Sequence, residues 1–406
     1  MSSSRPAHAR LAPEVAGGST LEWLLAPRTR AEFFGEIWER GPLVVRRGQP
    51  GYFERLFSLD EADRVLTTLD RRFPDITLKD ARRELSGDDY TFDDDRLDVA
   101  RVFALFDTGA TVMMAYLDEV VPALGDFCRG LEAEFSCPCQ TNVYLTPPNT
   151  QGAKAHYDTH DVFVLQIAGS KHWTLFGTPI ESPLAGQEFD PARDALGPVS
   201  LEFELAPGDV AYLPRGLAHE AQASDEVSLH ITAGVLRTTW ADLLFEALAG
   251  ACLRDAALRK ALPPGFARPD FDRRAVAETL RELWRRAEPH LDAEAALELF
   301  ASHLEAARPP SWRGQLAQLQ AARDLQPASW LARRPGLAPR CQTRADGGLT
   351  LEIPGRAITV PAAAAPAARF ALAQPRFRPR DLPGLDPGGQ LTLARRLVRE
   401  GLLLVV

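Results

Sequence analysis

The spacing of apolar residues divides the chain into a helical beginning, a strand-rich middle and a second helical stretch. From Thr20, leucines and then aromatic residues recur at intervals of three and four, which predicts helix up to the stop at Gly41-Pro42. The strand-like triplet 43–45 follows, and the apolar positions of residues 120–135 have the period of an amphipathic helix. We therefore expect a folded domain that begins near residue 19.

Between Gln140 and Leu236 the pattern changes to short apolar runs separated by glycine and proline turns. These runs predict six strands, at residues 141–145, 162–167, 172–176, 200–205, 210–213 and 227–233. Short strands at this spacing are typical of an antiparallel sandwich or barrel. The middle of the chain is therefore expected to form a β core.

Helical periodicity returns after Trp240 in three stripes, at residues 243–248, 276–287 and 299–304. Such helices pack either on a β core or on another subunit. The last hundred residues contain a hairpin-like run from Leu349 to Val360 and a closing helix and strand. We expect four parts: a flexible leader at 1–18, a first domain at 19–238, a helical region at 239–310 and an α+β end domain at 311–406.

Composition narrows the class of protein. Of 406 residues, 45% are hydrophobic and 25% charged, which is average for globular proteins and excludes a disordered, collagen-like or coiled-coil chain. The net charge of −9 argues against a protein that coats nucleic acid through a broadly basic surface. No apolar run approaches the roughly 20 residues of a membrane helix, and the N-terminus lacks the apolar segment of a signal peptide. Five dispersed cysteines fit a reducing compartment, so we expect a cytoplasmic protein without membrane contact.

Five of the eight histidines lie between residues 156 and 230. An extended chain would point His156, Asp158 and His160 to one face, because side chains alternate along a strand. Two histidines and one carboxylate on one face of an octahedron are typical of non-haem iron oxygenases. The second histidine must then come from a neighbouring strand, and His219, which follows a strand and a Pro-Arg-Gly turn, is the candidate. A centre with His160 as an additional ligand stays open.

An ordered set of motifs resembles a known family. The H-x-D of His156 and Asp158 precedes the run Asp161-Val-Phe-Val-Leu-Gln, then Gly169-Ser-Lys-His-Trp, and a P-G-D-x-x-Y-x-P-x-G-x-x-H motif ends at His219. Over residues 140–235 these motifs resemble the JmjC-type cupins and, more narrowly, the ribosomal oxygenases, which are Fe(II)- and 2-oxoglutarate-dependent protein hydroxylases. The resemblance implies an α+β fold with a double-stranded β-helix (jelly-roll) core, a helical dimerisation region and a C-terminal winged-helix-like domain.

The same resemblance implies which residues carry the chemistry. His156, Asp158 and His219 would bind Fe(II), at which O2 reacts, and Lys171 would pair with the distal carboxylate of 2-oxoglutarate. A lysine suits that task, because its ammonium group ends a long stem and neutralises a carboxylate inside a closed barrel. The chain has only four lysines, which makes a chance lysine at this position improbable.

Further residues match family positions around the co-substrate. Asn142 and Tyr144 would line the pocket, although Tyr144 also fits a simple core aromatic. Ser228 would hydrogen-bond the co-substrate, while the neighbouring His230 fits a buried histidine of the barrel interior better than a functional one. His172 is expected to point away from the face of Lys171 and to be structural.

The resemblance implies a 2-oxoglutarate-dependent dioxygenase that hydroxylates a protein side chain and releases succinate and CO2. The expected substrate is an arginine or histidine of a basic ribosomal protein, and the expected assembly is a homodimer through residues 239–310. Demethylation of methyl-lysine starts from the same hydroxylation step. A hydroxylase of a biosynthetic peptide or small molecule also stays open, as does a metal-binding cupin without redox chemistry. An interaction protein with a relic barrel is disfavoured, because no ligand position is lost.

The C-terminal domain is expected to contact protein or to be structural. Its closing helix carries Arg395, Arg396 and Arg399, but the preceding segment, residues 381–386, is acidic. Direct nucleic-acid binding is therefore not expected.

Overall fold

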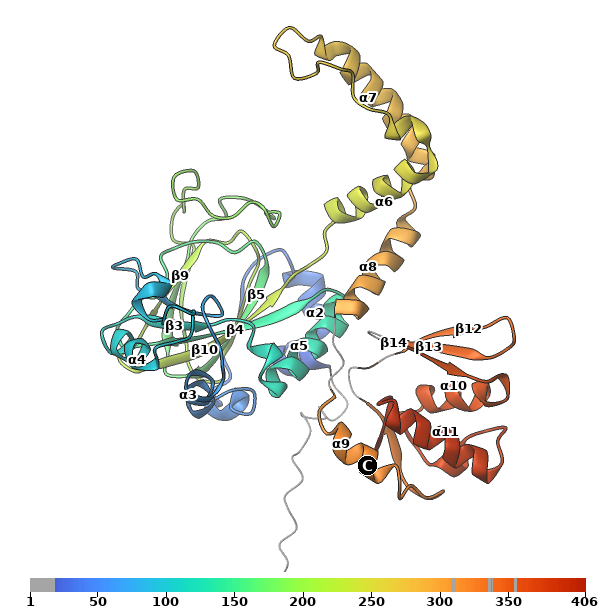
Figure 1. Cartoon of the computed structure of the whole chain (residues 1–406). Coiled ribbons are helices and arrows are strands. Elements are labelled where there is room, and N and C mark those ends of the chain that lie inside the picture. The colour runs from blue at the N-terminus through green and yellow to red at the C-terminus, as the bar shows by residue number, and fades with distance from the viewer. Residues whose placement is uncertain (1–18, 308–311, 335–336, 338, 354–355) are drawn as a thin grey trace, which may run out of the picture. The chain divides into compact units, whose positions relative to one another are not determined.

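A computed structural model describes residues 19–307, 312–334, 337, 339–353 and 356–406 (Figure 1). The expected leader, residues 1–18, lies outside this part of the chain. The chain divides into two compact units, one that ends at Thr238 and one that begins at Thr239. Among the described residues, no helix has the length and apolar character needed to cross a membrane.

The predicted N-terminal helical stretch is three short pieces. These are α1 (Thr20–Leu25), α2 (Arg30–Glu32) and the π-helical turn η1 (Phe33–Ile37). Ser19 and Thr29 each begin a piece with a capping box, because each side chain accepts from a backbone amide three residues on and the glutamate there accepts in return. The apolar period alone therefore predicted helix correctly but not the interruption at residues 26–29.

The remaining helices of the first unit surround a sheet. They are α3 (Leu59–Thr68), α4 (Val99–Asp107) and α5 (Pro122–Phe135), with 3-10 turns η2 (Pro50–Phe53), η3 (Gly87–Asp89) and η4 (Leu117–Glu119). The amphipathic helix predicted at residues 120–135 is confirmed as α5, whose buried residues include Leu124, Phe127 and Leu131.

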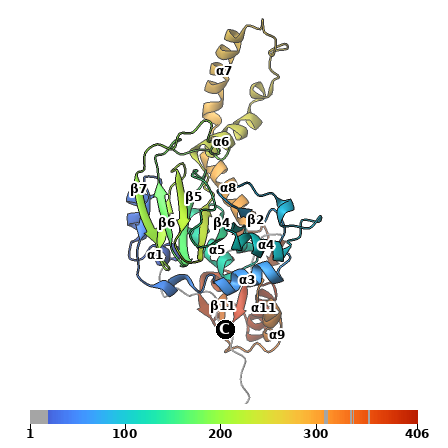
Figure 2. The same ribbon diagram turned by 90° about the vertical axis from the view of Figure 1, so that its left-hand side faces the viewer.

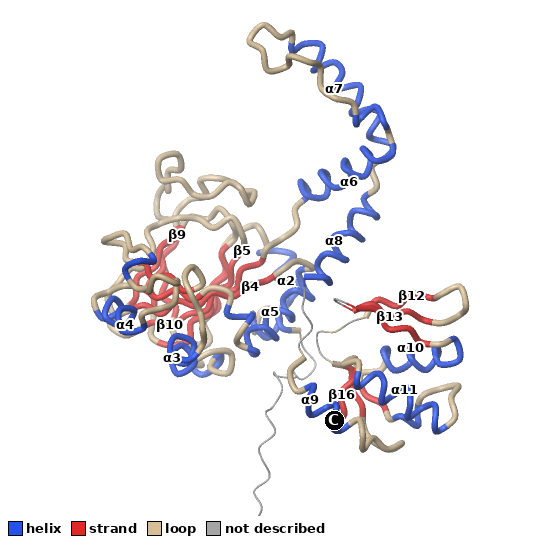
Figure 3. The backbone as a smooth tube through the Cα atoms, viewed as in Figure 1, coloured by secondary structure: helices blue, strands red, loops and turns tan. Residues whose placement is uncertain are grey.

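A seven-stranded antiparallel sheet forms the centre of the first unit, in the order β1-β8-β5-β10-β4-β3-β2. Figure 3 shows β4, β5 and β10 of this sheet in red. Its strands are β1 (Leu43–Val45), β2 (Ile76–Lys79), β3 (Thr111–Met114), β4 (Cys139–Thr146), β5 (Asp161–Ala168), β8 (Val210–Leu213) and β10 (Ser228–Val235). A smaller antiparallel sheet has the order β7-β6-β9, and β6 and β7 lie side by side in Figure 2. It consists of β6 (Lys171–Leu175), β7 (Leu201–Leu205) and β9 (His219–Ala223).

The central strand β5 contributes to a core on each face of the large sheet. Val162 and Val164 pack with Trp173 and other residues of the small sheet. Phe163 and Leu165 point the other way, into a core shared with the N-terminal helices. Because consecutive side chains alternate between faces, one apolar run can serve both cores. The first unit is thus a two-sheet β core with helices on the outer face of the larger sheet.

The six predicted strands of the middle region are confirmed as β4 to β8 and β10. Sequence reasoning missed β9, because its residues His-Glu-Ala-Gln-Ala carry no apolar run. It also missed β2 and β3.

The second unit begins with three long helices, which confirm the three predicted stripes: α6 (Trp240–Arg254), α7 (Arg273–Ala287) and α8 (Ala293–Ala307). Two 3-10 turns, η5 (Ala256–Arg259) and η6 (Glu288–His290), connect them.

The C-terminal part of the second unit has its own core. It contains two three-stranded sheets, with orders β15-β11-β16 and β12-β13-β14. Their strands are β11 (Leu331–Arg333), β12 (Arg340–Thr343), β13 (Leu349–Ile353), β14 (Arg356–Val360), β15 (Arg376–Phe377) and β16 (Leu403–Val405). The helical elements are α9 (Gln315–Ala321), η7 (Ala362–Ala364), α10 (Ala365–Ala373), η8 (Pro379–Asp381) and α11 (Pro387–Arg399). The predicted hairpin, closing helix and closing strand are confirmed as β13–β14, α11 and β16.

Candidate metal centre

Three side chains that could hold a metal come from two segments joined by backbone hydrogen bonds. His156 and Asp158 lie in the loop before β5, and His219 is the first residue of β9. The backbone amides of His156 and His219 each donate to the other's carbonyl, at 3.1 and 2.8 Å. The amide of Gly216 donates to the Asp158 carbonyl at 2.9 Å. The Pro-Arg-Gly turn therefore holds the loop that carries His156 and Asp158 against His219.

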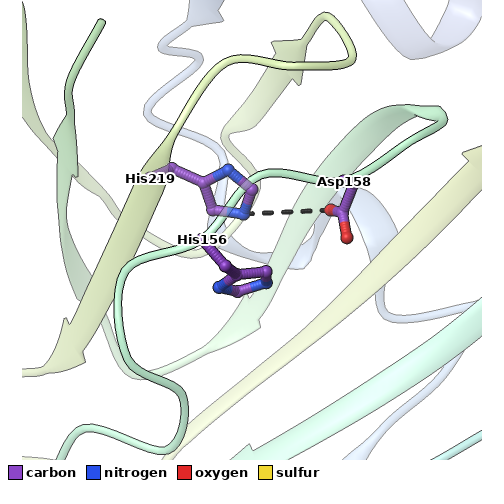
Figure 4. Close-up of side chains that lie close together, drawn as sticks. All are labelled: His156, Asp158 and His219. Atoms are coloured by element: carbon purple, nitrogen blue, oxygen red, sulfur yellow. Dashed lines mark ion pairs between the residues drawn. The ribbon is translucent and has the colours of Figure 1, made fainter. Parts of the chain in front are cut away.

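The donor atoms of His156, Asp158 and His219 all lie within 4.8 Å of one another (Figure 4). His219 Nε2 is 3.9 Å from Asp158 Oδ2. The Nδ1 atom of His156 lies 2.8 Å from the Lys154 carbonyl oxygen, and that of His219 lies 3.0 Å from the Leu217 carbonyl oxygen. A carbonyl oxygen only accepts, so each Nδ1 carries the proton and each Nε2 keeps a lone pair for a ligand. Two imidazole nitrogens and one carboxylate are thus ready for a cation.

The charge states suit the same purpose. Burial acts to raise the pKa of Asp158, but the charges of His219, His160 and His156 outweigh it and leave the pKa below its usual value. Burial lowers the pKa of His219 although Asp158 opposes the shift. Near neutral pH the carboxyl is therefore ionised and the imidazole neutral, the forms that bind metals.

His160 does not join this group of donor atoms. Its ring lies against Gly234 of β10, where an added Cβ would be 2.7 Å from His160 Cδ2. The alternation argument fails here because regular extended structure begins only at Asp161, the first residue of β5. The additional-ligand alternative therefore has no geometric support.

A cavity in the first unit contains the candidate metal ligands and a buried lysine. Its volume is about 80 Å³, which is room for several waters or one small organic anion. The rings of Tyr144 and His230 stack in this cavity with their centroids 4.8 Å apart. The ring centroid of Trp173 lies 5.8 Å from that of His219 and 5.9 Å from that of His230. Its lining also includes Lys79, Thr111, Gly152, Ala153, Val162, Val164, Lys171, Glu220, Ala221 and Thr232.

Lys171 is the most unusual group of this cavity. Its side chain is 4% exposed, and among the described residues no carboxylate forms an ion pair with it. Burial lowers the pKa of Lys171 to about 7. The next residue, His172, is exposed and lies 3.7 Å from Glu202, so it points outward as predicted. An inward lysine without a counter-charge indicates an anionic ligand.

A second orphaned donor lies beside Lys171. Trp173, two residues along β6 and on the same face, has a buried Nε1 without a hydrogen-bond partner in the part of the chain that the structure describes. Buried polar groups are normally paired, so this indole NH also points to a missing acceptor. Sequence reasoning passed over Trp173, although strand alternation from Lys171 would have found it.

Two of the expected pocket residues lie outside the cavity lining. The Asn142 amide oxygen accepts from the Tyr116 backbone amide at 3.3 Å. The Ser228 hydroxyl accepts from Gln166 at 2.8 Å and is fully buried. Tyr144 and Lys171 do line the cavity, and so does His230, which the sequence favoured as a buried interior residue.

A buried polar network supports the metal loop from behind. Arg237 donates to the carbonyls of Thr159 at 2.7 Å and Pro183 at 2.8 Å. Its Nε lies 3.7 Å from the carboxylate of Asp161, which also accepts from the Tyr212 hydroxyl at 2.8 Å. Burial raises the pKa of Asp161 to about 6. Arg237 thereby holds the residue that follows Asp158.

Comparison with known proteins gives a consistent result. Residues 125–243 match the JmjC domain model. Ribosomal oxygenase 1 of Rattus norvegicus is 34% identical over 254 residues, which cover 60% of this chain and 42% of that protein. The bifunctional lysine-specific demethylase and histidyl-hydroxylase NO66 of Culex quinquefasciatus is 32% identical over 260 residues, covering 61% of this chain and 39% of that protein. The chain thus spans about half or less of the length of these curated relatives.

The fold has a counterpart among solved structures. The ribosomal oxygenase YcfD of Escherichia coli superposes with a TM-score of 0.52 at 17% identity, over 93% of this chain and 98% of that one. The same protein was also solved with cobalt and 2-oxoglutarate, with a TM-score of 0.51 at 16% identity and the same coverage. Residues 125–243 are therefore similar to a JmjC domain, and the chain shares its fold with the Escherichia coli protein.

Proposed function

We propose that this protein is an Fe(II)- and 2-oxoglutarate-dependent oxygenase that hydroxylates a side chain of a ribosomal protein. The observation that carries the proposal is the buried, unpaired Lys171 in one cavity with His156, Asp158 and His219. A cupin without redox chemistry would need the metal ligands but not a buried cation beside them. The relatives named ribosomal oxygenase support the choice of reaction and substrate class.

The residues present fit the metal. His156 and His219 offer Nε2 lone pairs whose direction is set by the Nδ1 contacts, and Asp158 supplies the negative charge. Three protein ligands leave coordination positions open for a co-substrate and O2. When bound, Fe(II) with 2-oxoglutarate and O2 supplies the oxidant that inserts one oxygen atom into a C–H bond, with release of succinate and CO2.

Lys171 binds and orients the co-substrate. Its ammonium group neutralises the distal carboxylate of 2-oxoglutarate, and this contact replaces the hydration that burial removes. The Nε1 of Trp173 donates to an oxygen of the same ligand and so acquires the acceptor that it otherwise lacks. With both ends of a small dicarboxylate fixed, the cavity selects its length as well as its charge.

Aromatic and branched side chains exclude water. The stacked pair Tyr144 and His230 lies beside Trp173, and Val162 and Val164 also line the cavity. Burial lowers the pKa of His230 well below its usual value, and Lys171 adds to the shift, so His230 stays neutral. The Lys171 ammonium group is therefore the buried partner for the carboxylate, whereas Lys79, which also lines the cavity, is exposed.

The proposed substrate is an arginine or histidine side chain of a basic ribosomal protein. This proposal is supported by the names of the relatives, one of which is a histidyl-hydroxylase and demethylase. The excess of acidic over basic residues in this chain fits a basic partner, since opposite net charges favour encounter. Such a substrate also implies a cytoplasmic location, where ribosomes are found.

The test is an anaerobic titration of metal-free protein with Fe(II) and 2-oxoglutarate, followed by visible absorption. We expect a charge-transfer band that requires both additives, disappears in His219→Ala and needs far more 2-oxoglutarate in Lys171→Ala. His172→Ala, which changes the outward-facing neighbour of Lys171, is the matched control and should behave as wild type. Tight metal binding without any such band would overturn the assignment. With the band present, ribosomal proteins can be screened for a mass gain of one oxygen atom.

The finer architecture is part of the same proposal. The two sheets of the first unit correspond to a double-stranded β-helix, and residues 311–406 to a winged-helix-like domain.

We also propose a homodimer through residues 239–310, because α6 exposes Trp240, Phe245 and Leu253 at 81%, 69% and 79%. Light scattering should give twice the mass of the chain for wild type and a smaller mass for Phe245→Glu/Leu253→Glu.

A further inference from the structure

The C-terminal part of the chain has the opposite charge to the rest. Residues 311–406 contain 14 arginines and no lysine against 6 acidic residues, a net charge of +8. Residues 1–310 contain 32 basic and 49 acidic residues, a net charge of −17. The whole-chain value of −9 conceals this asymmetry, which is typical of proteins with a polyanion-binding part.

Several of these arginines converge on one exposed tryptophan. The guanidinium carbons of Arg376 and Arg378 lie 4.6 and 4.1 Å from the ring centroid of Trp330, which precedes β11. Arg395 of α11 donates to the Leu325 carbonyl at 3.2 Å, and the Arg380 amide donates to the Pro327 carbonyl at 3.2 Å. Two guanidinium groups thus lie against Trp330, a third reaches the start of the turn at residues 325–330, and the backbone of Arg380 is bonded to the same turn. We call Trp330, Arg376, Arg378, Arg380 and Arg395 the Trp330 cluster.

The guanidinium groups of the Trp330 cluster lack acidic partners. No ion pair within the described residues includes any of the four arginines, whereas Arg344 and Arg356 elsewhere in this part pair with Asp346 and Glu400. Asp381 accepts from the Arg378 backbone amide at 2.8 Å.

Two donors of the cluster are both buried and unsatisfied. The Nε atoms of Arg378 and Arg395 have no hydrogen-bond partner among the described residues. An anion that reaches these guanidinium groups would supply the acceptors that they lack.

We propose that the Trp330 cluster binds the phosphodiester backbone of a nucleic-acid strand. Stacking on an indole fixes the guanidinium planes, and a fixed planar fork with paired donors matches the oxygens of a phosphate. Trp330 itself is 37% exposed, so its free edge is available to a base. This proposal departs from the expectation, drawn from the whole-chain charge and from the acidic segment at residues 381–386, that direct nucleic-acid binding is absent.

The experiment is fluorescence anisotropy of the full-length protein with a fluorescein-labelled 20-nucleotide oligouridine at 50 mM salt. We expect binding that weakens linearly as log salt rises, since each neutralised phosphate of a single strand contributes about 0.7 to the slope. Arg376→Gln/Arg378→Gln should weaken binding about tenfold or more and reduce the slope by about 1.4. Arg281→Gln/Arg285→Gln is the matched control, because it removes two exposed arginines of α7 with the same charge change, and it should bind within twofold of wild type.

A second variant tests geometry rather than charge. Arg376→Lys/Arg378→Lys keeps both positive charges but removes the stacked planar forks, so its affinity should fall between those of wild type and the glutamine variant. Circular dichroism melting of each variant within about 2 °C of wild type shows that the fold is kept. Equal losses in the α7 control and the Trp330-cluster variant would overturn the proposal.

Competition separates the possible partners. Oligothymidine and duplex RNA of equal length show whether the strand is RNA or DNA, single or paired, and binding of any of these through Arg376 and Arg378 supports the proposal. Polyglutamate that displaces the RNA at equal charge concentration would overturn it and assign the surface to an acidic protein. Binding is measured without iron or 2-oxoglutarate, so this result is independent of the proposed oxygenase.

Discussion

Replacing Lys171 by methionine should stabilise the metal-free protein while it abolishes co-substrate binding. Burial lowers the pKa of Lys171 from 10.5 to about 7. At pH 7.5 the folded state therefore holds a lysine that is largely deprotonated, whereas the unfolded chain holds a protonated one. With about 1.4 kcal/mol per pKa unit, the penalty at pH 7.5 is up to ~4 kcal/mol. Methionine has a similar length and no charge, so it removes this penalty.

The sign of the pH dependence follows from proton counting. Between about pH 7 and 10.5 the unfolded state binds one more proton than the folded state at this position, so wild-type stability rises with pH in this window. The advantage of Lys171→Met should therefore shrink from ~4 kcal/mol at pH 7.5 to ~1.4 kcal/mol at pH 9.5.

Urea unfolding at the two pH values, followed by tryptophan fluorescence, measures this difference. Lys154→Met, which changes an exposed lysine of the loop before His156, is the matched control and should alter stability by less than about 0.5 kcal/mol. In parallel, Lys171→Met should retain metal affinity but lose 2-oxoglutarate binding. A variant that is less stable than wild type at pH 7.5, or whose advantage does not change with pH, would refute the argument that Lys171 is a buried amine whose protonated form lacks a carboxylate partner.

Three further results are expected. Trp173→Phe should weaken 2-oxoglutarate binding severalfold in the same spectroscopic titration, because it removes the unpaired Nε1, while Asn142→Ala should leave it unchanged; equal effects would contradict the assignment. His160→Ala should keep Co(II) affinity within about threefold in a calorimetric titration, whereas Arg237→Ala should lower it about tenfold because the carbonyl of Thr159 loses its donor. Gly208→Ala should destabilise the protein by about 2 kcal/mol or more in urea, since residue 208 has φ +90° and an added Cβ would lie 2.0 Å from the Gln49 carbonyl oxygen; an unchanged midpoint would contradict it.

The fold was predictable where apolar spacing is regular. The run at residues 162–167 reads as a strand because it is apolar apart from Gln166, and the structure explains why, since both of its faces are buried. The strand at 219–223 could not be found in this way, because Glu220 and Gln222 alternate with residues that are small or polar. Its register comes from pairing with β6, which is a tertiary contact.

The candidate site was also predictable only in part from the sequence. His156 and Asp158 could be paired from their spacing of two, and His219 from its place after a strand and a turn. The spacing argument also included His160, because it assumed an extended chain where the structure has a loop held by Gly216 and Arg237. Hydrogen bonds of this kind leave no periodic trace in the sequence, so the local argument cannot separate His160 from the other two.

Two sets of buried polar groups without partners each suggest a ligand. In the first unit, Lys171 and the Nε1 of Trp173 are buried without partners on one face of β6. In the C-terminal part, Arg378 and Arg395 have buried Nε atoms without acceptors next to Trp330. Hydrophobic residues of similar size would stabilise both places more, because unpaired buried polar groups are unfavourable. We therefore expect anions to supply the partners that these buried donors lack. The anion is a small dicarboxylate in the first unit and a phosphate backbone in the C-terminal part.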